Sequence, residues 1–363
     1  MQDPLADTEI CLRDIAQFKK LGVNTIRVYT TDNSANHDEC MKALADAGIY
    51  VIIDANNPLY SINRLDPAPS YNTKYLQSVF ASVDEFIKYD NTLAFFSGNE
   101  VINDNVKSTK SARYVKAVTR DMRAYIKSRG YRAAPVGYSA ADVAQNRMQL
   151  AHYMNCGTED ERSDFFAFVS ILFAGCSLPN PVPNAYRTTI LGATPTLNNP
   201  AGTKRSKTSP TTASPSCKPS PTDSPASPLT LYSLSEYGCT TNGRDFGEVA
   251  ALMSDKMTPV YSGGLLYEYA LEDNGFGIAK IPSPKAKDIE KKEGFDKFAK
   301  ALKQNPAPQG DGGYTSTTRA VACPTKDSNW LVDSTLLPAI PEGAKKVCLF
   351  PYMSLYGWLV RCR

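Results

Sequence analysis

The chain has 363 residues, of which 42% are hydrophobic, and this is enough for one large domain or two ordinary ones with a substantial core. Lys and Arg number 40 against 37 Asp and Glu, and the basic residues form no blocks interleaved with aromatic residues. This pattern excludes a nucleic-acid partner. The two histidines, His37 and His152, lack ligand spacing, which argues against a histidine-based metal site and a Ser-His-Asp triad.

Nine dispersed cysteines form no C-x-x-C pair. They indicate either long-range disulfides in an oxidising compartment or buried free thiols in a cytosolic enzyme, and composition does not separate these alternatives. The first residues, MQDPLADTEI, lack the apolar core of a signal peptide, so the protein is either cytosolic or lacks its original N-terminus. Residues 348–360 are apolar but interrupted by a proline, and they are too few to span a bilayer.

Helices and strands alternate along the chain. Residues 7–22 carry Cys11, Ile15 and Phe18 at helical spacing, end at Gly22, and lead into the β-branched run TIRVY at 25–29. The same helix–strand unit recurs at residues 40–54, 75–98 and 112–138, and three further strands are predicted at 164–171, 231–238 and 262–269.

Continuous apolar strands separated by amphipathic helices predict a parallel sheet covered on both faces. Seven such strands favour a closed (β/α) barrel over an open sheet. No glycine-rich phosphate loop follows any of these strands, which weakens the alternative of a dinucleotide-binding domain.

Residues 177–230 differ from the rest because they are dense in Pro, Ser and Thr and lack helical or strand periodicity. A segment of this composition buries too little apolar surface to offset its ordering entropy. We therefore predict a disordered surface insertion within the barrel. The alternative is a Pro-rich ligand for a partner that binds polyproline helices.

Two predicted strands end on a glutamate. FFSGNEV places Asn99 and Glu100 at the end of the third strand, and LYSLSEYGC places Glu236 at the end of the sixth. The carboxyl ends of barrel strands lie on one face, so both acids are expected at the barrel mouth. Two carboxylates so placed are the equipment for glycoside hydrolysis. The alternative for each glutamate alone is a capping or salt-bridged surface residue.

The residues carry a specific family resemblance. IRVYTTD, CMKALADAGIYVIID, SINR, FFSGNEV, SEYGC, SGGLLYEY and CPTKDSNWLVDSTLLPAIPEGAKK resemble the fungal β-1,3-glucanosyltransferases of glycoside hydrolase family 72. The resemblance implies a retaining (β/α)8 TIM-type barrel enzyme that cuts internal β-1,3-glucan bonds. The enzyme transfers the new reducing end to another glucan chain. The alternatives are a retaining endo-β-1,3-glucanase and an inactive, truncated family member.

The resemblance also implies the surroundings of the enzyme. Its partners are β-1,3-glucan donor and acceptor chains, and it works at the outer face of the plasma membrane or in the cell wall. A GPI anchor would be its only membrane attachment. Neither a metal nor an organic cofactor is expected, because the carboxylate chemistry needs none. The sequence does not fix the oligomeric state.

Site residues carry over by position. Glu100 matches the family's acid/base, Glu236 its nucleophile, and Asn99 the amide that hydrogen-bonds the sugar 2-hydroxyl. The division of labour requires the two carboxyl groups to differ in pKa, with the acid raised and the nucleophile ionised.

Three further residues match positions that line the sugar-binding cleft. These are Tyr29 in IRVY, Asp54 in VIID, and Tyr269 in YEY at the end of the last strand. Sugars stack on aromatic rings and hydrogen-bond to carboxylates. The alternatives are a core-edge ring for each tyrosine and a loop cap for Asp54.

The resemblance implies two disulfide bonds, Cys11–Cys40 and Cys156–Cys323. The second would tie the barrel to a short C-terminal segment. The family partner of Cys239 falls at Ala174, which leaves Cys239 without an assigned partner.

The sequence departs from the family pattern at its start, near residues 169–232 and after 346. We expect the family's first strand to be missing, which would expose two unpaired sheet edges. A donor-site tyrosine is absent near Val169. The expected domain plan is catalytic barrel at 1–176 and 231–346, insertion at 177–230, and an atypical tail at 347–363.

Overall fold

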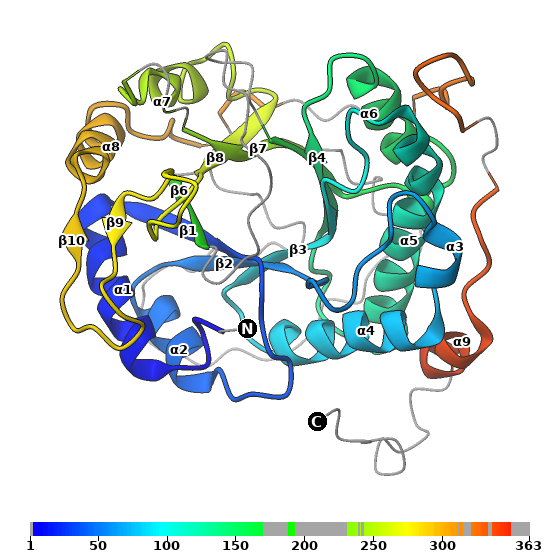
Figure 1. Cartoon of the computed structure of the whole chain (residues 1–363), viewed down its shortest axis with the longest axis horizontal. Coiled ribbons are helices and arrows are strands. Elements are labelled where there is room, and N and C mark those ends of the chain that lie inside the picture. Colours follow the sequence, from blue (N-terminus) through cyan, green and yellow to red (C-terminus); the bar gives the residue numbers. More distant parts are fainter. Residues whose placement is uncertain are drawn as a thin grey trace, which may run out of the picture.

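The computed structural model describes residues 3–169, 188–192, 231–238, 240, 243–310, 312–314, 321–332 and 336–349. Its centre is a closed barrel with strands in the order β1-β2-β3-β4-β5-β7-β8-β6 (Figure 1). All but one of the strands run parallel, and these are β1 (Val23–Val28), β2 (Tyr50–Asp54), β3 (Thr92–Asn99), β4 (Val136–Ala141), β5 (Phe165–Val169), β7 (Leu231–Tyr237) and β8 (Tyr261–Leu266). The seven strands predicted from the sequence are therefore confirmed.

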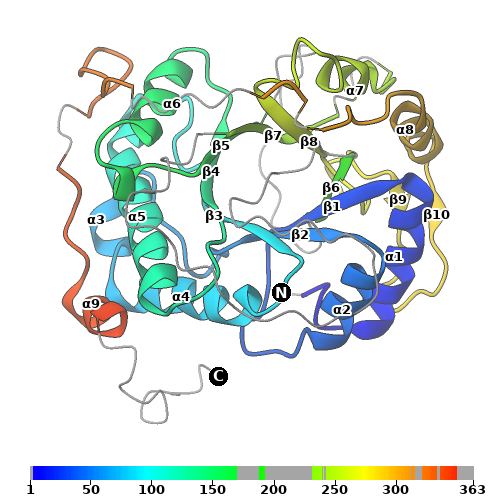
Figure 2. The same ribbon diagram turned by 180° about the vertical axis from the view of Figure 1, so that it is seen from behind.

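Helices surround the barrel, as the two opposite views show (Figures 1 and 2). The longer helices are α1 (Thr8–Leu21), α2 (Asp38–Asp46), α4 (Thr73–Ile87), α5 (Ala112–Ser128), α6 (Arg147–Asn155) and α8 (Glu293–Gln304). The shorter elements are α3 (Pro67–Ser70), α7 (Gly247–Leu252), α9 (Glu342–Leu349) and the two-stranded sheet of β9 (Ala279–Lys280) and β10 (Glu290–Lys291). No helix among the described residues is long and apolar enough to cross a membrane.

Helix α1 illustrates how local sequence sets the elements. The Asp7 side chain accepts hydrogen bonds from the backbone N–H groups of Glu9 and Ile10, which satisfies two of the free donors at the helix start. Gly22 ends the helix with φ of 80°, a left-handed conformation that glycine adopts without a steric penalty. Strand β1 begins at the next residue, so the turn between helix and strand is tight.

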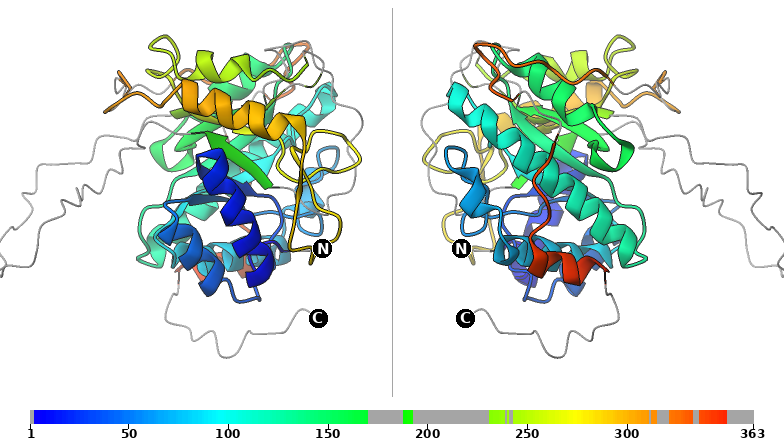
Figure 3. Two further views of the ribbon diagram at one scale, coloured as in Figure 1. Left: turned by 90° about the vertical axis from the view of Figure 1, so that its left-hand side faces the viewer. Right: turned by 90° about the vertical axis from the view of Figure 1, so that its right-hand side faces the viewer.

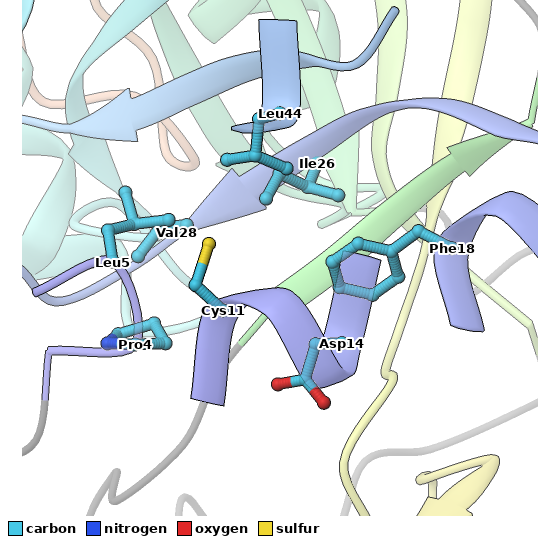
Figure 4. A pocket seen from close by; sticks show the side chains of 8 residues that line it. All are labelled: Pro4, Leu5, Cys11, Asp14, Phe18, Ile26, Val28 and Leu44. Carbon is cyan, nitrogen blue, oxygen red and sulfur yellow. The ribbon is translucent and has the colours of Figure 1, made fainter. Parts of the chain in front are cut away.

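Strand β1 has two differently occupied faces. Ile26 and Val28 pack toward the helices, whereas Arg27 lies on the other face, because side chains alternate along a strand. On the helix side, Figure 4 shows a small, mainly apolar pocket between α1, α2 and β1. It is lined by Pro4, Leu5, Cys11, Asp14, Phe18, Ile26, Val28 and Leu44. This pocket is on the opposite side of β1 from Arg27.

Strand β6 (Thr188–Gly192) corrects two expectations. It lies in the Pro/Ser/Thr-rich segment for which no regular structure was predicted, and it pairs antiparallel with β1 and β8. The sheet between β8 and β1 is therefore closed, and the expected pair of open edges is absent. The physical reason is that TTILG is rich in β-branched residues and finds backbone partners on both sides. The rest of the predicted insertion, residues 177–187 and 193–230, lies outside the described residues.

Both disulfides implied by the family resemblance are present. They are Cys11–Cys40, which joins α1 to α2, and Cys156–Cys323, which spans 167 residues of sequence. The second disulfide holds residues 321–332 against the barrel. There, fully buried Trp330 lies with its ring centroid 5.4 Å from that of Tyr153. Cys239, Ala174 and residues 350–363 of the predicted tail lie outside the described residues.

The outer helices also contact each other around the barrel. Helix α8 packs on α1, and α9 packs on α4 and α5, as the side views show (Figure 3). Helix α9, which comes after the barrel in the chain, thus packs against α4 and α5, the helices that precede and follow β3. Helices α4 and α5 in turn contact β3, the strand that precedes Glu100.

Candidate active site

The two glutamates lie at the ends of parallel strands, on the face where barrel enzymes place their chemistry. Glu100 directly follows β3, and Glu236 is the second-last residue of β7, with β4 and β5 between these strands. Glu100 has φ of 47°, in the left-handed region, and its N–H donates to the carbonyl of Ser139 at 2.8 Å. Glu236 is only 6% exposed. The strand-end positions predicted for both acids are confirmed.

Arg27 joins the groups at the barrel mouth. Its guanidinium is fully buried and makes a bidentate pair with Asp54, Nε to Oδ1 and Nη2 to Oδ2, each at 2.8 Å. Nη2 also donates to Asn99 Oδ1 at 2.9 Å, and Nη1 lies 3.5 Å from Glu236 Oε1. The Arg27 guanidinium therefore connects Asn99, the residue before Glu100, to Glu236 across the mouth of the barrel.

The charge of Arg27 is fixed by its surroundings. Burial alone would lower its pKa, but the Asp54 carboxylate, Tyr29 and Glu236 outweigh burial and raise the pKa. The guanidinium carbon lies 4.2 Å from the ring centroid of Tyr29 and 4.3 Å from that of Phe96. Arg27 is therefore a permanent positive charge that is held between two rings and faces the carboxylates of Asp54 and Glu236.

Hydrogen-bond chemistry sets the orientation of Asn99. Arg27 can only donate, so the Asn99 atom that faces it must be the amide oxygen. The Ser139 hydroxyl donates to the same oxygen at 2.6 Å. Among the described residues, the hydrogen bonds to Asn99 end on Oδ1, and its NH₂ group is left to donate to a ligand.

Tyr29 contacts the second glutamate directly. Its hydroxyl donates to Glu236 Oε1 at 2.6 Å, and burial raises the pKa of the phenol well above its usual value. The phenol therefore stays protonated and acts as a donor to the carboxylate. The structure thus brings the side chains of Glu236, Asn99, Tyr29 and Asp54 together around Arg27, and Glu100 directly follows Asn99 in the chain.

Tyr269 does not join this cluster. It is 1% exposed, its hydroxyl donates to Asp14 of α1 at 3.0 Å, and its ring packs edge-on against Phe18 at 4.9 Å. The expectation that Tyr269 lines the cleft is therefore corrected. Because β8 ends at Leu266, strand alternation no longer decides which way the side chain at 269 points.

The aromatic residue on the site side of this segment is Tyr267. Tyr29, Tyr267 and Phe276 form one cluster of rings, with the rings of Tyr267 and Phe276 5.6 Å apart. Asn274 donates to the Tyr267 hydroxyl at 3.2 Å. The YEY motif pointed to the correct segment, but the first tyrosine lies at the site and the second does not.

Sequence reasoning also missed Arg27 and Ser139. A charged residue inside an apolar strand is costly to bury without a partner, and this was the available signal in TIRVY. For Ser139 there was no comparable signal, because a serine within a strand is common. Its hydroxyl lies 2.8 Å from that of Ser235, which links β4 to β7 beneath the acids.

Fold and site together define a class of protein: a (β/α) barrel with two glutamates at the carboxyl ends of its strands, where barrel enzymes carry their active sites. A family model described as glucanosyltransferase matches residues 1–180 and 226–305. The chain therefore belongs to the glucanosyltransferases of glycoside hydrolase family 72.

Individual relatives agree with this assignment. The 1,3-beta-glucanosyltransferase gel1 of Aspergillus fumigatus is 51% identical over 347 residues, covering 95% of this chain and 68% of the relative. The 1,3-beta-glucanosyltransferase gas4 of Schizosaccharomyces pombe is 43% identical, covering 94% and 68%. The solved structure of Saccharomyces cerevisiae Gas2p in complex with laminaripentaose is similar with a TM-score of 0.73. It has 30% identity and covers 96% of this chain and 70% of that one.

Proposed function

We propose that this protein is a retaining β-1,3-glucan transglycosylase. It cleaves an internal β-1,3-glucosidic bond and transfers the new reducing end of the donor to a second glucan chain. The observation that carries the proposal is the buried cluster in which Arg27 and Tyr29 fix Glu236 opposite the Asn99–Glu100 pair. Membership of the glucanosyltransferase family supports the same reaction.

In the first half of the reaction, Glu236 is the nucleophile. Its Oε2 attacks the anomeric carbon, while Oε1 stays bonded to the Tyr29 hydroxyl and faces Arg27. Glu100 donates its proton to the departing glucosidic oxygen as that bond breaks. The products are a covalent glucosyl ester on Glu236 and a released sugar chain with a free hydroxyl.

In the second half, Glu100 is the base. It removes the proton from an acceptor sugar hydroxyl, the acceptor oxygen attacks the anomeric carbon, and the ester bond to Glu236 breaks. Two inversions give retention of configuration. In both halves the Asn99 NH₂ group donates to the sugar 2-hydroxyl. Its Oδ1 already accepts from Arg27 and Ser139, and no hydrogen bond joins the NH₂ group to the part of the chain that the structure describes.

We further propose that the protein works outside the cell, in the cell wall or at the outer face of the plasma membrane. The two disulfides support an oxidising compartment, since such bonds are rare in the cytosol. Attachment would be through a GPI anchor, as is usual for the family.

Single substitutions test the carboxylate assignment. Glu100→Gln and Glu236→Gln should each lower turnover of a laminari-oligosaccharide by at least about 10²- to 10⁴-fold, the usual contribution of a positioned acid or base. Glu293→Gln is the matched control, because Glu293 is an exposed residue of α8 paired only with Lys297 in the described contacts. More than a few per cent of turnover in either site variant would sink the assignment.

A further inference from the structure

One motif singled out in the sequence has no part in the proposed chemistry. SINR, residues 61–64, lies in the loop between β2 and α3. There, Nη2 of Arg64 donates to the backbone carbonyl of Glu100 at 2.9 Å. The loop after β2 therefore contacts the main chain of the residue that we propose as the acid/base.

Glu100 has a backbone that needs such support. Its φ of 47° lies in the left-handed region, which residues with a side chain adopt rarely. Its N–H donates to the Ser139 carbonyl at 2.8 Å, and its carbonyl accepts from Arg64. Both polar atoms of this backbone unit are thus held by partners from other elements.

Arg64 itself is held in place. The buried Ser111 hydroxyl donates to the Arg64 carbonyl at 2.6 Å, and the neighbouring Ile62 is buried in the core. The Asn63 side chain accepts from the N–H of Leu65 at 3.0 Å, which fixes the turn that follows. An anchored main chain limits the positions that the guanidinium can reach.

The charges of Arg64 and Glu100 also act on one buried group, the Tyr138 hydroxyl. The buried Tyr138 hydroxyl, which accepts from the N–H of Ile102, is affected by both groups. Burial raises the pKa of Tyr138, Glu100 raises it further, and Arg64 opposes both. Arg64 and Glu100 therefore act on the same hydroxyl group with opposite sign.

We infer that Arg64 is a positioning residue for the acid/base: its charge-assisted hydrogen bond holds the left-handed backbone of Glu100 so that the carboxyl group points at the glucosidic oxygen. This inference rests on the proposed role of Glu100. Arg64 does not transfer a proton or contact the reacting atoms. Its effect should appear only in steps that need the acid.

The test compares two leaving groups on one donor. An unmodified laminari-oligosaccharide needs protonation of its leaving oxygen, whereas the same donor with a 2,4-dinitrophenyl group at its reducing end does not. Arg64→Ala should lower kcat/KM about 10- to 100-fold on the unmodified donor, the size expected for a misplaced catalytic group. On the dinitrophenyl donor the change should stay within about threefold, because no protonation is needed there. Arg64→Lys should recover part of the loss.

Arg132→Ala is the matched control. Arg132 also donates to a backbone carbonyl, that of Tyr89 at 3.1 Å, and it contacts the opposite end of β3 at Thr92. It should lower kcat/KM equally for the two donors or leave both unchanged. An equal loss on both donors for Arg64→Ala, or no loss on either, would overturn the inference.

Glu100→Gln separates failure of the inference from failure of the proposed function. It should abolish activity on the unmodified donor and keep kcat/KM on the dinitrophenyl donor. If Glu100→Gln lowers kcat/KM equally on the unmodified and the dinitrophenyl donors, the acid/base assignment is wrong. If Glu100→Gln behaves as expected and Arg64→Ala does not, only the positioning role of Arg64 is wrong.

Discussion

Asp54→Asn tests whether the buried ion pair holds the site together. The substitution keeps the shape of the side chain and removes the negative charge that pairs with Arg27 through two contacts of 2.8 Å. Arg27 is fully buried, so its charge cannot be solvated by water in place of the lost partner.

The expected loss of stability in Asp54→Asn follows from the geometry of the ion pair. Removing one partner of a buried ion pair typically destabilises a protein by about 3–5 kcal/mol. Since Glu236 still lies 3.5 Å from Arg27, we expect the lower part of this range, about 3–4 kcal/mol. An unfolding entropy of roughly 2.1 cal/mol/K per residue gives roughly 1.3 °C per kcal/mol for a chain of 363 residues, so the midpoint of thermal unfolding should fall by roughly 4–5 °C.

Thermal unfolding followed by circular dichroism measures the effect. Asp46→Asn is the control, because the Lys42–Asp46 pair is 75% and 66% exposed and should contribute about 0.5 kcal/mol or less. Turnover should also fall for Asp54→Asn, because Arg27 orients both Asn99 and Glu236. A midpoint that shifts no more than that of the control would refute a structural role for the ion pair.

Two further substitutions have defined outcomes. Tyr29→Phe removes the 2.6 Å hydrogen bond to Glu236, which is worth about 1.5–3 kcal/mol for a charged acceptor. The free energy of unfolding should fall by about that amount, and turnover should fall about 10- to 100-fold because Glu236 loses the group that orients it. Unchanged turnover would contradict this. The two ring nitrogens of His37 each lie 2.8 Å from a carboxylate oxygen, one of Asp3 and one of Glu85. Burial alone would lower the pKa of His37, but these hydrogen bonds outweigh burial and raise the pKa. His37→Gln should therefore destabilise the protein most below about pH 6.5, the unfolded value. The loss should shrink as pH rises through the folded pKa, and a pH-independent loss in urea unfolding would be inconsistent with this.

Much of the fold could be predicted from the sequence because its signals are local. The alternation of apolar runs with amphipathic helices, such as the one that ends at Gly22, predicted the seven parallel strands. The ends of two of these strands predicted the positions of Glu100 and Glu236. Strand β6 could not be found this way, since its stability comes from backbone pairing with β1 and β8 rather than from its surroundings in the sequence.

The sequence predicted the two glutamates of the site but not the residues that hold them in place. Arg27 lies within an apolar strand, and only the folded barrel shows that it reaches Asp54 and Asn99. The family resemblance pointed to Tyr269. Both Tyr267 and Tyr269 follow the same strand, and the direction of a side chain beyond a strand end depends on tertiary packing. Long-range contacts of this kind leave little trace in a single sequence.

The product profile on a defined laminari-oligosaccharide tests the central claim most directly. The purified protein should convert a donor of one length into both shorter products and products longer than the donor, and Glu236→Gln should yield neither. A profile that contains only shorter products would show that water, and not a second glucan chain, receives the sugar. That result would contradict transglycosylation and identify a hydrolase.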